Sequence, residues 1–105
     1  MHIQHNLAAT KQQAIHKLTA VREPGQNFAG GIRFTMMDGP TRVICWVTRE
    51  ALDHINRGNA YKQDHMVCFE RHRRRLERLA SQKYDAGERS PIVMTFDFET
   101  WHRSA

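Results

Sequence analysis

The sequence lacks long hydrophobic runs and recognisable catalytic motifs. No apolar run approaches the roughly 18 residues that a membrane-spanning helix needs, so we expect no membrane partner. The first residues also lack the charged start, apolar centre and cleavage site of a secretory signal, which predicts a cytoplasmic protein. Gly30-Gly31 precedes a predicted strand, whereas a phosphate-binding loop follows one. An enzyme is therefore disfavoured, and no cofactor is expected.

Cysteine is scarce, and histidine is poorly placed for a metal site. Cys45 and Cys68 have no spacing suited to zinc and lie in apolar surroundings, so we interpret both as buried free thiols. His2, His5 and His16 crowd the amino-terminal end, with no fixed carboxylate or cysteine beside them. The sequence therefore predicts no metal site.

The composition is that of one small globular domain with an excess of positive charge. The chain has 105 residues, of which 26% are charged and 40% apolar. Its net charge of +5 favours polyanionic partners if that charge is focused on one face. Residues 71–78 carry five arginines against one glutamate, so the charge is partly focused.

The stretch from Asp64 to Gly87 is the strongest helical signal in the chain. Asp64 can cap the start of a helix, and Gly87 suits the left-handed turn that ends one. At 3.6 residues per turn, one face is apolar and the opposite face is basic. The apolar stripe comprises Met66, Phe69, Leu76, Ala80 and Tyr84, with Leu79 at its edge, and the basic face comprises Arg71, Arg74, Arg75 and Arg78.

Two readings of the basic face remain open. It is either a solvated helix surface or a nucleic-acid-binding surface, in which case weak binding to phosphates is expected. Arg73 lies toward the apolar side, where we expect a structural ion pair with Glu77 or with Asp97. His72 flanks the apolar stripe and is interpreted as a boundary histidine, although a pocket lined by it would favour an enzyme.

Three segments have the patterns of strands. Residues 31–38 alternate apolar and polar side chains, and Asp38-Gly39-Pro40 forms a turn. Residues 41–48 are apolar on both faces, which predicts a central strand or a strand whose second face is an interface. That second face carries Ile44 and Trp46. Thr48 then caps a short helix that ends near Asn56, and residues 91–99 alternate again as a third strand.

These segments predict an α+β fold in two parts. Residues 28–105 form one domain, a three-stranded antiparallel sheet in β-β-α-α-β order with the long helix packed on one face. Residues 1–27 form an amino-terminal appendage with a helix between about Thr10 and Arg22. The face with Ile44 and Trp46 is then left for the amino-terminal segment or a second copy of the chain to cover.

A known family shares several of these features. The runs GIRFTMMDG, VICWVTREAL and CFERHRRRLERLA with KYDAG resemble a family of small bacterial proteins known as domain of unknown function 1488. Its marks are Phe34 in the first strand, Ala51-Leu52 in the short helix, and a Phe-x-x-x-Arg-x-x-x-Glu spacing on the long helix. The resemblance covers about residues 30 to 100. It implies a compact α+β module with no assigned activity.

Our leading hypothesis is a non-catalytic interaction or accessory module that acts as a homo-oligomer through Ile44 and Trp46. The alternative is a nucleic-acid-binding module that uses Arg71, Arg74, Arg75 and Arg78. An enzyme acting on a small substrate is a third and less favoured class.

Overall fold

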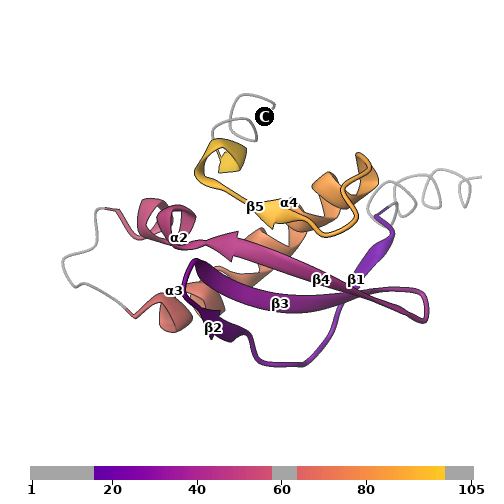
Figure 1. The fold of residues 1–105 in the computed structure, drawn as a ribbon, viewed down its shortest axis with the longest axis horizontal. Coiled ribbons are helices and arrows are strands. Elements are labelled where there is room, and N and C mark those ends of the chain that lie inside the picture. The colour runs from indigo at the N-terminus through magenta and orange to yellow at the C-terminus, as the bar shows by residue number, and fades with distance from the viewer. Residues whose placement is uncertain (1–15, 58–63, 99–105) are drawn as a thin grey trace, which may run out of the picture.

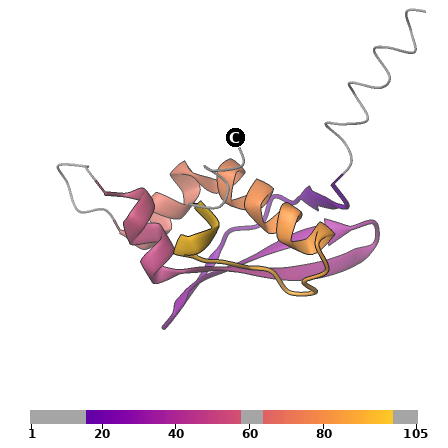
Figure 2. The same cartoon turned by 90° about the horizontal axis from the view of Figure 1, so that it is seen from above.

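The protein is built from two layers, a β-sheet and a set of helices that cover one face of it. The computed structural model describes residues 16–57 and 64–98. Figure 1 shows the sheet in front of the helices, and Figure 2 shows from above that α2, α3 and α4 lie on the same side of it. In the part of the chain that the structure describes, no element covers the other face. Because the structure combines one β-sheet with several helices, it confirms the α+β class predicted from the sequence.

A long hairpin forms the middle of the sheet. β3 (Gly31–Asp38) and β4 (Thr41–Thr48) pair antiparallel along their whole length, with Phe34 opposite Cys45. Gly39 takes a positive φ of 59° in the predicted turn, which glycine adopts without strain. β4 also pairs with β5, so the prediction that this strand is central is confirmed.

The helix predicted between Thr10 and Arg22 is wrong in its second half, because residues 18–20 form a strand. β1 (Leu18–Ala20) pairs with the far end of β3, and β2 (Gln26–Phe28) pairs with its beginning. The free edge of β3 needs hydrogen-bond partners, and these two short strands supply them. The first half of the predicted helix lies outside the described residues.

The long helical stretch is interrupted once. α3 (His65–Arg71) begins after Asp64, whose side chain accepts a hydrogen bond from the backbone N–H of Met66, as the sequence predicted. His72 then leaves helical geometry, and α4 (Arg73–Asp85) follows. Hydrogen bonds continue through the break, because the His72 N–H still donates to the Cys68 carbonyl at 3.1 Å. The predicted apolar and basic faces therefore survive in two helices instead of one.

The short helix after the hairpin is confirmed. α2 (Arg49–Ile55) begins at Thr48, whose hydroxyl accepts a hydrogen bond from the Ala51 N–H at 3.1 Å. Ala51 and Leu52 are fully buried. At the end of α4, Gly87 has a φ of 112°, so the predicted left-handed residue after the helix is also confirmed.

The third predicted strand is wrong in length and direction. β5 is only Ile92–Val93, and it runs parallel to β4. The pairing is parallel because α4 carries the chain back toward the end of the sheet at which β4 begins, and β5 then runs in the same direction as β4. Asp97 accepts a hydrogen bond from the Met94 N–H at 2.7 Å, which starts a helical turn over residues 95–98 instead of a longer strand. The sheet consequently has five strands and is mixed.

The core lies between the sheet and the helices. Its centre is a ring contact between Phe34 of β3 and Phe69 of α3, whose centroids are 5.3 Å apart. Both thiols are buried and free, as predicted. The other buried apolar residues include Ile32, Val47, Leu52, Leu76, Leu79, Ala80, Val93 and Phe98.

Candidate interaction surfaces

Alternation along the strands places Ile44 and Trp46 on the uncovered face of the sheet. Both side chains are half-buried, while their neighbours Val43, Cys45 and Val47 point into the core. This confirms that β4 is apolar on both faces. We call the surface formed by Phe28, Arg33, Ile44, Trp46 and Ile92 the open sheet face.

An aromatic pair is the main feature of the open sheet face. Phe28 lies opposite Gly31 in the β2–β3 pairing, and its ring meets that of Trp46 edge-on with centroids 5.3 Å apart. A side chain at Gly31 would be strained at a φ of 153°, and its Cβ would lie 2.0 Å from the Val47 carbonyl oxygen. Glycine at position 31 thus allows the close approach of the β4 backbone at Val47 and Thr48. The guanidinium of Arg33 stacks on Phe28, 4.8 Å from the ring centroid.

Apolar surface on this face is exposed to solvent. Phe28 is 46% exposed, and Ile92, opposite Trp46 in the β4–β5 pairing, is 42% exposed. A shallow hollow of about 160 Å³ lies beside Trp46 and Ile92.

Sequence reasoning missed Phe28 and Ile92 as members of this face. The Asn27-Phe28-Ala29-Gly30-Gly31 run held a signal for the first, since a glycine opposite an aromatic residue leaves room for its ring.

The predicted arginines line a second surface on the helix layer. Arg71, Arg74, Arg75 and Arg78 border an open hollow of about 630 Å³ between the helices and the connection from β1 to β2. Arg22 borders the same hollow from that connection. We call these five arginines and the space between them the arginine groove. The structure therefore brings the four predicted residues together, and it adds Arg22, which the sequence did not indicate.

Arg73 lies within this region but has a structural role. Its Nε donates to Glu77 at 3.0 Å, which confirms the predicted ion pair, while Asp97 pairs with Lys83 instead. Its guanidinium also donates to the carbonyl oxygens of Glu23 at 2.6 Å and Val21 at 3.4 Å. Arg73 thereby fixes the connection between β1 and β2 against α4.

The remaining arginines keep their charge uncompensated. Within residues 16–57 and 64–98, no carboxylate lies at ion-pair distance from any of the five arginines of the groove. The two glutamates that border the groove, Glu70 and Glu77, both pair with Arg73. Arg75 also stacks on Phe98, at 5.0 Å from the ring centroid. The groove is thus a concentration of positive charge.

The positive charge of the groove affects the pKa of His72. Burial lowers the pKa of its imidazole, and the nearby charges of Arg71 and Arg75 lower it further. No serine, threonine, cysteine or tyrosine lines the hollow, so His72 has no neighbouring hydroxyl or thiol to activate there. The many arginines of the lining are suited to holding an anion.

Other titratable groups serve the fold. His16 bonds Asp85 through Nδ1 at 2.6 Å, which holds the start of the described chain against the end of α4. Burial raises the pKa of Cys45 to about 12, with Glu77 adding to the shift, and burial also raises that of Cys68.

In the two described ranges, no group of histidine, cysteine and acidic side chains could hold a metal ion, and no helix is long and apolar enough to cross a membrane. His2 and His5 lie outside those ranges.

A family model described as "Protein of unknown function (DUF1488)" matches residues 25–94, two thirds of the chain. The chain belongs to this family. No curated protein and no solved structure was found to match it. The DUF1488 region includes the open sheet face and the four helix arginines, whereas Arg22 precedes it. The family description names no activity.

Proposed function

We propose that this DUF1488 protein is a non-catalytic interaction module that self-associates through the open sheet face. The observation that carries the proposal is the uncovered sheet, on which Phe28, Trp46 and Ile92 present apolar surface from three strands. Burying such a surface against another apolar surface is favourable by about 25 cal/mol per Å².

A second copy of the chain is the occupant that the charges favour. Arg33 of this face is already engaged, because it bonds Gln26 and stacks on Phe28. Arg42 lies two residues before Ile44 on the same side of β4, and it pairs with Glu23 at 2.8 Å. An acidic partner would find little free charge there. Two-fold dimers, in which the same patch contacts itself, are the commonest symmetric assemblies.

The size of the face sets the expected strength of the contact. The five strands together hold 24 residues, each covering about 3.3 Å along the strand and about 4.8 Å across it, which gives a projected area of about 380 Å². Stable interfaces bury about 800 Å² on each partner. We therefore expect a reversible dimer at micromolar concentrations.

Two lysine substitutions test the proposal. Ile92→Lys puts a charge on the open sheet face, and Val67→Lys puts one on α3, where Val67 is 51% exposed and far from that face. Light scattering across a micromolar concentration range should show dimer for the natural chain and for Val67→Lys, and monomer for Ile92→Lys. A natural chain that stays monomeric, or a dimer that Ile92→Lys leaves intact, would remove the proposal.

A second candidate function is nucleic-acid binding by the arginine groove. The observation that favours it is the gathering of Arg71, Arg74, Arg75 and Arg78 around one open hollow with no carboxylate partner in the described chain. Binding through phosphates alone is independent of sequence and weakens steeply with salt. Labelled-oligonucleotide titration of a variant with all four arginines changed to alanine tests this function.

A further inference from the structure

The arginine groove has two walls, and they come from distant parts of the chain. Arg71 belongs to α3, and Arg74, Arg75 and Arg78 belong to α4, while Arg22 belongs to the connection between β1 and β2. The hydrogen bonds from Arg73 to the Glu23 and Val21 carbonyls hold this connection beside the helix. The distance between the walls is therefore set by the fold.

The chemistry of the lining selects phosphate over base. Apart from the arginines, the groove is lined by Ala20, Val21, the two glutamates paired with Arg73, and His72. No phenylalanine, tyrosine or tryptophan is available to stack on a base, and no asparagine or glutamine is available to read an adenine edge. Guanidinium groups bind phosphate through paired hydrogen bonds, which makes arginine well suited to a phosphodiester chain.

We propose that the groove holds the phosphate backbone of a single nucleic-acid strand, with Arg22 contacting the strand from the wall opposite the helix arginines. The proposal rests on the nucleic-acid-binding function above and adds the second wall and the single strand. A hollow of about 630 Å³ is within the usual range for ligand pockets, so a single chain can lie in it. A duplex is much bulkier, since its major groove alone is about 12 Å wide, so we expect it to contact the helix arginines without reaching Arg22.

The spacing of the arginines also suits a flexible strand. Residues three or four apart on a helix are separated by about 5 Å along its axis. One strand of rigid B-form DNA winds its phosphates around the duplex axis with a rise of about 3.4 Å, whereas a single strand can turn successive phosphates toward the arginines. Five phosphate contacts give a slope of log affinity against log salt of about −3.5 for a single strand.

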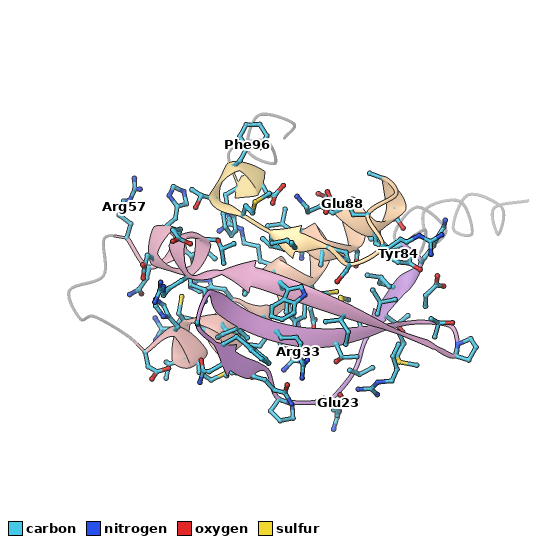
Figure 3. The ribbon with its side chains drawn as sticks, viewed as in Figure 1. Glu23, Arg33, Arg57, Tyr84, Glu88 and Phe96 are labelled. Atoms are coloured by element: carbon cyan, nitrogen blue, oxygen red, sulfur yellow. The ribbon has the colours of Figure 1, made fainter. Side chains whose placement is uncertain are left out.

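The test is a fluorescence-anisotropy titration of a labelled oligothymidylate at several salt concentrations. Binding should weaken about a hundredfold between 50 and 200 mM salt. Arg22→Ala should reduce the slope by about 0.7, and the four-arginine variant should reduce it by about 2.8. Arg57→Ala is the matched control, because Arg57 is exposed beyond the end of α2 (Figure 3), outside the groove, and its loss lowers the net charge equally. It should leave the slope unchanged.

The results for these variants distinguish failure of the two-walled site from failure of the nucleic-acid-binding function on which it rests. If the four-arginine variant loses binding and Arg22→Ala does not, the helix face binds nucleic acid but the two-walled site is wrong. If no variant differs from Arg57→Ala, both are wrong. Tighter binding of a duplex, or equal binding of polyglutamate with the same dependence on Arg22, would also overturn the proposal. The NMR titration of His72 gives a second readout, since a bound strand should raise its pKa only when it occupies the groove.

Discussion

Replacing Arg73 with alanine should destabilise the domain far more than replacing its neighbour Arg74 with alanine. The Arg73 side chain is 16% exposed and that of its partner Glu77 is 11% exposed, so the substitution leaves a nearly buried carboxylate without its cation. It also removes the bonds to the Glu23 and Val21 carbonyls and the contact of the guanidinium with the Phe69 ring at 5.2 Å.

Breaking a buried ion pair by removing one partner costs about 3 to 5 kcal/mol. A domain of this size is stable by about 5 to 15 kcal/mol, so Arg73→Ala should take a large share of the total. The double variant Arg73→Met, Glu77→Leu removes both charges together. It should be less damaged than Arg73→Ala, by about 1 to 3 kcal/mol, because no buried charge is left unpaired.

The assay is urea unfolding followed by circular dichroism, with Arg74→Ala as the control. Arg74 is exposed and has no ion pair with a described residue, so its loss should change the unfolding free energy by no more than about 0.5 kcal/mol. Equal stability of Arg73→Ala and Arg74→Ala would refute the assignment of Arg73 as the link between the β1–β2 connection and α4.

Three further predictions concern the core and the titratable groups. Phe69→Ala should lower the unfolding free energy by about 3 to 5 kcal/mol in urea melts, because the ring is fully buried. Cys45 and Cys68 should stay unreactive toward a thiol reagent at pH 8 until the protein is unfolded, and fast labelling of the folded protein would contradict their burial. Burial raises the pKa of Asp85, but hydrogen bonds from His16 and from the backbone of residue 17 outweigh it, so the pKa is lowered from 3.8. The stability that Asp85 contributes is therefore full above pH 3.8 or so and lost as the pH falls through its folded value, and Asp85→Asn should show a shallower acid decline in unfolding free energy.

Features decided by local sequence were the ones that could be predicted. The helical period set which side of α3 and α4 is apolar, and Asp64, Thr48 and Gly87 marked helix ends through their own side chain or backbone freedom. The doubly apolar pattern of β4 likewise located Ile44 and Trp46 on a second face.

Features decided by distant partners could not be predicted. β1 and β2 are three residues each and are strands only because the edge of β3 pairs with them. Alternation over residues 91–99 fits either pairing direction, and the side chain of Asp97 ends the strand after two residues. Arg22 joins the groove only because Arg73 holds the β1–β2 connection beside α4.

The solvent access of Trp46 tests the central claim most directly. The chain has two tryptophans, so a Trp101→Phe variant reports Trp46 alone. Acrylamide quenching of its fluorescence should be efficient in dilute protein and should fall as the concentration rises through the micromolar range, because a second copy then covers the open sheet face. Quenching that stays weak at every concentration in a monomeric protein would mean that another part of the same chain covers Trp46. Quenching that stays strong in a proven dimer would place the contact elsewhere, and either result would contradict self-association through this face.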